Sequence, residues 1–292
     1  LYAETVSVGC PPDALNQKGQ DWGLPPCIPN QMKEEAYAQL SAVLARNMQY
    51  ASAIRLDHAL GLYRLFWIPP NADARSGAYV YYPFEDVVKL IALESHRNQC
   101  VIIGEDLGTV TEIVQTTMAQ WKMLSYKVLY FEKVAHDAFK RPEHYQPIAL
   151  VTSGTHDLPT LKGFWEEDDI EIRTNLNLYP SDDLRHQQIE ERQLDKQGLL
   201  KLLNGYNLWD NMDVNQPWTA ELCMAIEHVL SKSNSVLQLV QVEDVLCQRN
   251  QMNVPGTTTE HPNWRQKLSL NIENWRENSH LENLQGCLSG RS

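Results

Sequence analysis

The sequence lacks the features that would assign it to a membrane protein or to a cysteine-based metal protein. No stretch approaches the ~20 consecutive apolar residues of a membrane-spanning helix. The six cysteines form no Cys-x-x-Cys pair and no Cys/His pattern with metal-ligand spacing, so we expect them to be reduced. The first residues, Leu1 to Glu4, resemble neither a signal peptide nor an initiator methionine. We therefore expect a soluble, cytoplasmic chain that is truncated at its N-terminus.

Positive charge is also scarce. The 292 residues contain 25 Lys and Arg against 37 Asp and Glu, and the formal net charge is −12. Partners that carry phosphate groups require clusters of basic side chains, which the sequence does not contain. We therefore expect no nucleic-acid partner and no association with anionic membranes. A neutral substrate fits this composition better.

Glycine and proline are concentrated near the start of the chain. Their density over residues 5–29 predicts a long surface loop without regular structure, and residues 77–83 are expected to form another loop. The apolar content of 5–29 favours an ordered loop that covers another part of the molecule. Trp22 in this loop could stack on a ligand or could only anchor the loop by packing.

Helical and strand patterns then alternate along the chain. Apolar residues recur at helical spacing over 31–48 and 84–97, and further helices are expected over 112–119, 181–203 and 217–230. Apolar runs typical of buried strands cover 53–57, 100–106, 126–131, 148–152 and 235–240. This alternation predicts βα units and a parallel sheet. A doubly wound sheet stays possible, although its Gly-rich phosphate turn is missing. The other candidate, a closed (β/α)8 barrel, needs more strands than these runs supply.

Acidic residues follow three of these predicted strands. The strand ends carry the sequences Arg55-Leu56-Asp57-His58, Gly104-Glu105-Asp106 and Thr155-His156-Asp157. In a (β/α)8 barrel the carboxyl ends of all strands lie on one face. We therefore expect Asp57, Glu105 and Asp157 to converge, although they lie far apart in the sequence.

Converging carboxyl groups are typical of retaining glycosyl transfer, in which one attacks the sugar and the other acts as acid and base. Arg55 is two residues before Asp57 on the same strand face and would keep Asp57 ionised. Glu105 follows an apolar run and is better placed to keep its proton. Asp157, His156 and His58 could bind sugar hydroxyls.

Less specific explanations remain open at this point. The Arg55 to Asp57 pair could be a buried ion pair that only fastens a strand end. A histidine at a strand end is often a hydrogen-bonded structural residue, and Asp157 could be the N-cap of a following helix. The three acids and the histidines could also bind a metal ion.

Several motifs together resemble one enzyme family. They are Gly-Cys-Pro-Pro-Asp at 9–13, Gly-Gln-Asp-Trp-Gly-Leu-Pro at 19–25, Arg-Leu-Asp-His at 55–58, Gly-Glu-Asp-Leu-Gly at 104–108, Thr-His-Asp-Leu-Pro-Thr at 155–160, Asn-Val-Pro-Gly-Thr at 253–257 and Pro-Asn-Trp-Arg at 262–265. In order and over nearly the whole chain, the sequence is similar to the 4-α-glucanotransferases of glycoside hydrolase family 77, also called amylomaltases or disproportionating enzymes.

The resemblance implies an α/β fold of the (β/α)8 TIM-barrel type. Family members are considerably longer, so the barrel would be incomplete, with strands four to eight present and the first three absent. Residues 1–292 would form the C-terminal part of a single catalytic domain, in which 5–29 covers the acceptor channel and 158–234 is a mostly helical insertion. Cys10 stands where the family usually has a small residue.

The resemblance also implies the roles of individual residues. Asp57 matches the nucleophile, Glu105 the acid/base and Asp157 the transition-state stabiliser. The matched substrate-binding residues are Arg55, His58, His156, Trp22 and, through the Pro-Asn-Trp motif only, Asn263.

The implied reaction transfers a segment of an α-1,4-glucan such as maltodextrin to the 4-hydroxyl of an acceptor glucan, by retaining double displacement and without a metal or organic cofactor. Maltodextrins and acceptor sugars would be its partners, and protein partners are not indicated. Two alternatives stay open. One is an α-amylase-like retaining hydrolase with the same acids. The other is an inactive fragment or binding remnant, whose open sheet edges would favour aggregation.

Overall fold

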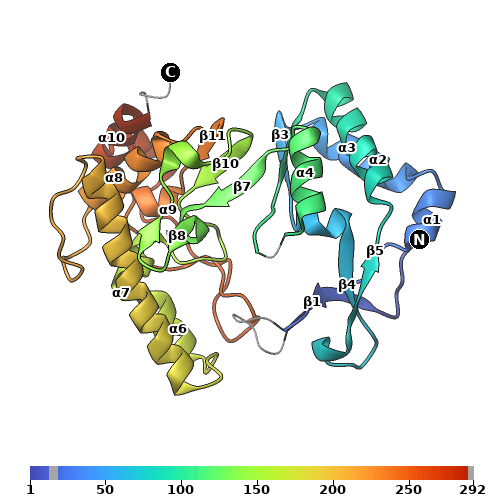
Figure 1. Cartoon of the computed structure of the whole chain (residues 1–292), viewed down its shortest axis with the longest axis horizontal. Coiled ribbons are helices and arrows are strands. Elements are labelled where there is room, and N and C mark those ends of the chain that lie inside the picture. Colours follow the sequence, from blue (N-terminus) through green and yellow to red (C-terminus); the bar gives the residue numbers. More distant parts are fainter. Residues whose placement is uncertain (13–18, 109, 289–292) are drawn as a thin grey trace. The chain divides into compact units, whose positions relative to one another are not determined.

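The computed structural model describes residues 1–12, 19–108 and 110–288. They divide into two compact units, Leu1–Tyr126 and Lys127–Ser292. Both units combine helices with strands, so the chain is an α/β protein, as the alternating pattern predicted (Figure 1).

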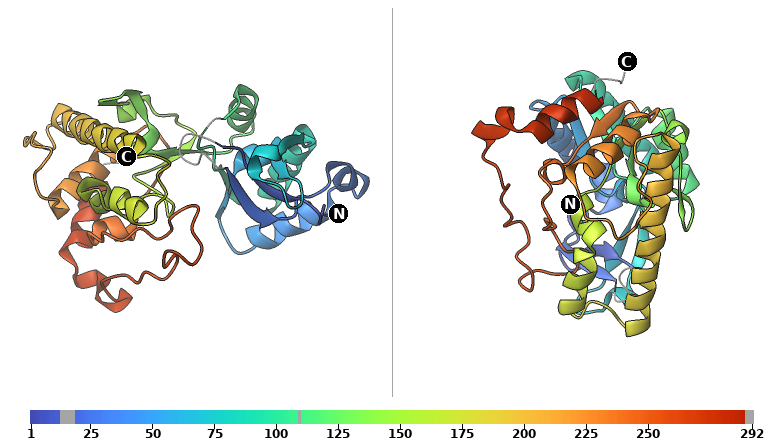
Figure 2. Two further views of the ribbon diagram at one scale, coloured as in Figure 1. Left: turned by 90° about the horizontal axis from the view of Figure 1, so that it is seen from below. Right: turned by 90° about the vertical axis from the view of Figure 1, so that its left-hand side faces the viewer.

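Two parallel strands of the first unit confirm part of the predicted sheet. Strand β3 (Ala53–Leu56) pairs with β6 (Val101–Gly104), with Leu56 opposite Gly104. Helices α2 (Ala38–Met48) and α3 (Phe84–Asn98) lie side by side (Figures 1 and 2), and α4 (Glu112–Gln120) follows β6. One apolar core joins these elements and includes the buried side chains of Leu44, Met48, Val87, Val88, Ile91, Ile102, Val114 and Met118.

An antiparallel sheet in the first unit was not predicted. Its strands are β1 (Ser7–Cys10), β2 (Gln20–Leu24), β4 (Arg64–Ile68) and β5 (Ala78–Tyr81), in the order β2-β1-β4-β5. The expectation that 5–29 and 77–83 lack regular structure is therefore wrong. The glycines permit close backbone approach here, since a Cβ on Gly9 would lie 1.9 Å from the carbonyl oxygen of Gln20. Residues 13–18 of the expected loop lie outside the described residues.

The predicted helix over 31–48 is divided in two. Helix α1 (Pro29–Glu34) ends before a turn, and α2 begins at Ala38. Ala36 and Tyr37 in this turn have φ angles of 49° and 59°. Two consecutive residues in the left-handed region cannot continue a right-handed helix. The Tyr37 hydroxyl donates a hydrogen bond to Asp86 at 2.7 Å, which ties the turn to α3.

The second unit contains a sheet with the strand order β11-β10-β7. Strands β10 (Ala149–Thr152) and β11 (Leu237–Leu239) are parallel, with Leu150 opposite Leu237. Strand β7 (Ser125–Val128) includes the last residues of the first unit. A small hairpin consists of β8 (Lys133–Ala135) and β9 (Ala138–Phe139).

The second unit also contains several α-helices. They are α5 (Leu161–Glu166), α6 (Asp168–Asn175), α7 (Asp182–Gly205), α8 (Ala220–Ser231), α9 (Val242–Val245) and α10 (Ser279–Leu288). Short 3-10 helices cover Ala59–Leu62, Ala74–Ser76, Leu129–Phe131, Pro142–His144 and Ile272–Glu277. Residues 158–234, expected to be mostly helical, contain α5 to α8.

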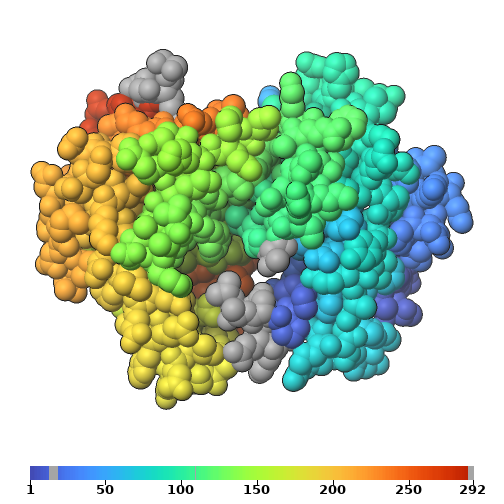
Figure 3. Space-filling model, viewed as in Figure 1, coloured from blue at the N-terminus to red at the C-terminus, as the bar shows by residue number. Residues whose placement is uncertain are grey.

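Helix α7 is held to α6 by a buried ion pair. The Arg192 guanidinium donates to both carboxylate oxygens of Asp169, at 2.9 and 2.8 Å, and lies 3.9 Å from the centre of the Phe164 ring. Both partners of the ion pair are buried. Figure 3 shows one flank of α6 and α7 at the surface of the second unit.

Candidate active site

Asp57 lies directly after β3 and pairs with Arg55. The Arg55 Nη1 is 2.7 Å from the Asp57 Oδ1, and the Asp57 side chain is 78 % exposed. Residues two apart on a strand point to the same face, which explains why the two side chains meet. The exposure of Asp57 contradicts the simpler explanation of a buried ion pair that only fastens the strand end.

The Arg55 side chain also contacts an aromatic ring. Its guanidinium carbon lies 5.2 Å from the centre of the Tyr126 ring, within the range of a cation–π contact. Tyr126 is buried, whereas Arg55 is partly exposed. Arg55 therefore bridges a buried aromatic ring and an exposed carboxylate.

The Glu105 carboxyl group accepts hydrogen bonds from two main-chain N–H groups, one in the turn after β3 and one in the segment after β6. The His58 N–H donates to Glu105 Oε2 at 2.9 Å, and the Leu107 N–H donates to Oε1 at 2.7 Å. The backbone of Glu105 also accepts from the Ala59 N–H at 2.8 Å and donates to the Leu56 carbonyl at 2.9 Å. The Glu105 carboxyl group is consequently fixed in orientation beside the residue that follows Asp57.

Burial raises the pKa of Glu105, and the negative charge of Asp57 adds a smaller contribution in the same direction. The hydrogen bonds from the backbone N–H groups and the charge of Arg55 oppose this shift without cancelling it. Glu105 therefore keeps its proton to a higher pH than an ordinary glutamate. This is the behaviour required of a general acid.

The Trp22 side chain contacts His58, the residue that follows Asp57. The Trp22 ring meets the His58 ring edge-to-face, with centroids 5.2 Å apart, and its indole N–H donates to Gln20 at 3.0 Å. Burial lowers the pKa of His58, although the charge of Asp57 acts in the opposite direction. The imidazole therefore stays neutral to a lower pH than an ordinary histidine. The β1–β2 hairpin thus places Trp22 against the turn that carries Asp57.

Asp157 follows β10 in the second unit and has its own set of contacts. Its Oδ1 accepts a hydrogen bond from Asn253 Nδ2 at 2.6 Å, and its Oδ2 lies 3.3 Å from His156 Nε2. The alternative that Asp157 caps the next helix is wrong. The N-cap of α5 is Thr160, whose hydroxyl oxygen accepts from the Gly163 N–H at 3.0 Å.

Loop residues 251–264 complete this second group. Gln251 Nε2 donates to the carbonyl of Asp157 at 2.9 Å, and the Trp264 ring lies 5.2 Å from the His156 ring. Asn263 accepts from the Val254 N–H at 3.0 Å and donates to the Thr257 hydroxyl at 2.7 Å. The structure therefore shows Asn263 organising the loop that carries Asn253.

The candidate residues fall into two groups. In the first unit the structure connects Trp22, Arg55, Asp57, His58 and Glu105, and in the second it connects His156 and Asp157. The contacts add residues to which the sequence reasoning gave no role: Asp106, Tyr126, Gln251, Asn253 and Trp264. The motifs at 253–257 and 262–265 contained a signal for two of these, Asn253 and Trp264, whereas Tyr126 belongs to no motif.

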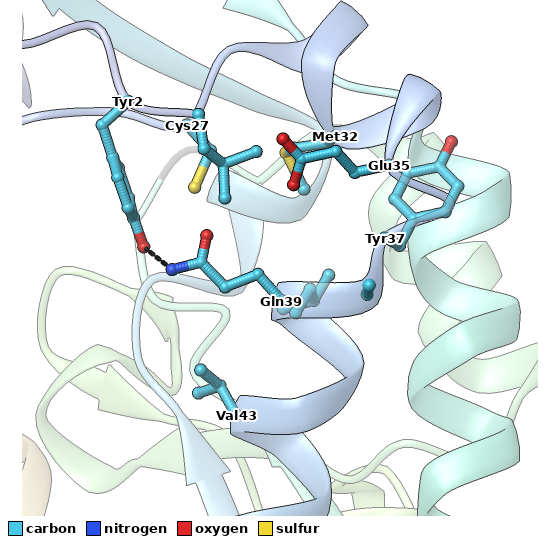
Figure 4. A pocket seen from close by; sticks show the side chains of 10 residues that line it. Tyr2, Cys27, Met32, Glu35, Tyr37, Gln39 and Val43 are labelled. Atoms are coloured by element: carbon cyan, nitrogen blue, oxygen red, sulfur yellow. Dashed lines mark hydrogen bonds between the residues drawn. The ribbon is translucent and has the colours of Figure 1, made fainter.

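A pocket elsewhere in the first unit contains none of the candidate residues. It is lined by residues from the chain start, α1 and α2, among them Tyr2, Met32, Tyr37 and Val43 (Figure 4). Within the described ranges, no group of three or more His, Cys, Asp or Glu side chains is arranged to hold a metal ion. No helix in the described part of the chain is long and apolar enough to cross a membrane.

Comparison with known proteins identifies the relatives of this chain. A family model described as 4-alpha-glucanotransferase, of glycoside hydrolase family 77, matches residues 1–271. The chain is 40 % identical over 273 residues to a 4-alpha-glucanotransferase of Haemophilus influenzae. This alignment covers 92 % of this chain and 39 % of the relative. It is 34 % identical over 276 residues to the 4-alpha-glucanotransferase of Mycobacterium bovis, in an alignment that covers 92 % of this chain and 37 % of the relative.

A solved structure is also similar. The crystal structure of amylomaltase from Corynebacterium glutamicum matches with a TM-score of 0.92 and 32 % identity, over 100 % of this chain and 43 % of that one. The chain thus spans about two fifths of the length of the relatives it matches.

Proposed function

The chain belongs to the 4-alpha-glucanotransferase family, and we infer from this premise that the whole protein transfers a segment of an α-1,4-glucan to the 4-hydroxyl of an acceptor glucan. The observation that carries this proposal is the contrast between two neighbouring acids. Asp57 is exposed and paired with Arg55, whereas burial raises the pKa of Glu105. Retaining glycosyl transfer needs this difference, because one acid must attack as a carboxylate while the other arrives protonated.

The proposed reaction has two steps. The Asp57 carboxylate attacks the anomeric carbon and forms a glycosyl ester, while Glu105 gives its proton to the departing glycosidic oxygen. The ionised Glu105 then takes the proton of the acceptor 4-hydroxyl, whose oxygen displaces Asp57 from the anomeric carbon. Protons and bonds balance, and the anomeric configuration is retained.

Arg55, His58 and Trp22 are proposed to contact the bound glucan. The Trp22 to His58 ring contact supports a covering role for the segment 5–29, at least for its β1–β2 hairpin. Covering the site would favour transfer over hydrolysis, because excluding water lets a sugar hydroxyl compete for the ester.

In the second unit, Asp157 is proposed to stabilise the transition state, with His156 and Asn263 as further substrate contacts. The hydrogen bond from Asn253 to Asp157 supports a fixed orientation of this carboxylate. These roles rest on the motif matches with the family.

We also propose that β3, β6, β7, β10 and β11 correspond to strands four to eight of a (β/α)8 barrel, and that 158–234 is a helical insertion. The parallel pairs β3–β6 and β10–β11 support this assignment, as does the exposure of the apolar side chains of Val236, Leu237 and Leu239 at β11. A cytoplasmic location, independence from metals and cofactors, and neutral glucan partners remain predictions of the sequence.

Product analysis of the whole protein tests the proposed reaction. Given maltotriose, the enzyme should release glucose and a ladder of longer glucans while the total number of reducing ends stays constant. A rise in reducing ends would contradict transfer and favour the hydrolase alternative.

Substitution of Asp57 tests the proposed nucleophile. Asp57→Ala should lower kcat on the order of a thousandfold or more with the fold intact. Glu34→Gln, an exposed acid on α1, is the matched control and should keep full activity. Activity of Asp57→Ala above a trace level would refute the assignment.

A further inference from the structure

The Arg55 side chain needs a second contact to orient Asp57. An arginine side chain has considerable rotamer freedom, and a single ion pair with a largely exposed partner restricts it weakly. The Tyr126 ring, 5.2 Å from the guanidinium carbon, supplies this second contact. A guanidinium that lies over a ring keeps its in-plane N–H groups free for a carboxylate, and Nη1 is 2.7 Å from Asp57.

Tyr126 is held in turn by Asp106. The Tyr126 backbone N–H donates to Asp106 Oδ1 at 2.7 Å, and the Ser125 hydroxyl donates to Asp106 Oδ2. Asp106 and Tyr126 are each only 7 % exposed. A buried carboxylate that accepts two hydrogen bonds at the start of β7 fixes the backbone from which the Tyr126 ring projects.

Asp106 is also the residue after Glu105. The two acids of the Gly-Glu-Asp motif therefore have different partners. Glu105 accepts from the N–H groups of His58 and Leu107, whereas Asp106 accepts from Ser125 and Tyr126. A single dipeptide thus connects the proposed acid/base to the residues that support the proposed nucleophile.

We propose that Tyr126 and Asp106 are positioning residues for the glycosyl-transfer step: Asp106 fixes Tyr126, the Tyr126 ring fixes the Arg55 guanidinium, and Arg55 holds the Asp57 carboxylate in its attacking orientation. The proposal rests on the function proposed above. Loss of the ring should slow attack by Asp57 and leave glucan binding and proton donation by Glu105 nearly unchanged.

The test compares Tyr126→Met with Tyr126→Phe in the whole protein. Methionine fills much of the buried volume without an aromatic face, whereas phenylalanine keeps the ring. Tyr126→Met should lower kcat by about 10- to 100-fold, as expected for a misplaced reacting group, with KM changed less than about threefold. Tyr126→Phe should stay within about threefold of the wild type.

A donor with an activated leaving group separates positioning of Asp57 from protonation by Glu105. The loss in Tyr126→Met should persist with this donor, because attack is still required, while the loss in Glu105→Gln should be partly relieved. Arg55→Lys, which keeps the charge but cannot present a planar fork, should likewise keep its loss of kcat with this donor. If Tyr126→Met fails to fold, as judged from its urea midpoint, Tyr126→Leu, which also removes the aromatic face, takes its place with the same expected results.

Tyr79→Leu is the matched control. It removes a similar cation–π contact on the antiparallel sheet, where the Arg64 guanidinium carbon lies 4.0 Å from the centre of the Tyr79 ring. It should leave kcat unchanged. The proposal is overturned if folded Tyr126→Met keeps wild-type kcat, if Tyr126→Phe loses as much as Tyr126→Met, or if the activated donor restores Tyr126→Met. An active Asp57→Ala would instead refute the proposed function itself.

Discussion

Glu227 makes the stability of the second unit depend on pH. It lies on α8 with no exposed surface, and Gln238 Nε2 donates to its Oε2 at 2.9 Å. Burial raises the pKa of Glu227 to about 8, and the nearby charge of Asp244 adds to the shift. The native state therefore holds the Glu227 proton at neutral pH, where an unfolded chain releases it.

The sign and size of the effect follow from this difference. A raised native pKa means that the native state binds more protons than the unfolded state, so stability falls as pH rises. With 4.5 as the ordinary pKa and about 8 in the native state, the loss between pH 5 and pH 9 is about 4 kcal/mol. The stabilisation is fully present only below pH 4.5 and is lost as pH rises through about 8.

Glu227→Gln removes this titration and keeps the shape of the side chain. Urea unfolding at pH 5 and pH 9, followed by hydrogen exchange of α8 peptides, measures the stability of this region. Burial also raises the pKa of Asp244, to about 6, but Asp244 is present in both proteins. It titrates while Glu227 is still mostly protonated, so the difference between the two proteins isolates Glu227.

Wild type should lose about 4 kcal/mol more than Glu227→Gln over this pH range. Glu221→Gln, an exposed acid on the same helix, is the control. Hydrogen bonds at the helix N-terminus lower the pKa of Glu221, so it stays ionised throughout and its substitution should not alter the slope. Equal pH dependence in wild type and Glu227→Gln would refute the reasoning.

Two further substitutions test a buried ion pair between helices and the end of a helix. Asp169→Asn leaves the buried Arg192 without its charged partner and should destabilise the second unit by about 3–5 kcal/mol in urea unfolding. Asp182→Asn, which breaks an exposed ion pair on α7, is the control and should not cause such a loss. Gln99→Gly should stabilise the first unit by about 0.5–1 kcal/mol, because Gln99 ends α3 with a φ of 51°, where glycine is unstrained. A lower thermal midpoint for Gln99→Gly would contradict that expectation.

The periodic elements were predictable, whereas the breaks between them were not. Strands β6 and β10 are largely apolar runs, and α3 has clear helical spacing, so local pattern alone located them. The β1–β2 hairpin was missed because its strands are short and lie among glycines and prolines, whose usual meaning is a loop. The turn at Ala36 and Tyr37 contains neither residue type and therefore gave no signal.

In the candidate site, too, some features were predictable from the sequence and others were not. Acids at strand ends can be recognised from the sequence because the end of an apolar run is visible there. The contact between Arg55 and Tyr126 could not be recognised, since it depends on two elements meeting in space and on a ring in a strand without a motif. Likewise, the periodicity that predicts a strand does not show which backbone N–H groups will face Glu105.

Main-chain hydrogen bonds orient Glu105 relative to the turn after β3. His58 adopts a left-handed conformation, with φ 47° and ψ 60°, which costs roughly 1–2 kcal/mol for a residue with a Cβ. In this conformation its N–H reaches Glu105 Oε2, while the neighbouring Ala59 N–H reaches the Glu105 carbonyl. Asp57 precedes His58 directly, so the strained turn that holds the proposed acid/base also carries the proposed nucleophile. The cost of this strain is offset by hydrogen bonds that fix the Glu105 carboxyl group and backbone before a substrate arrives.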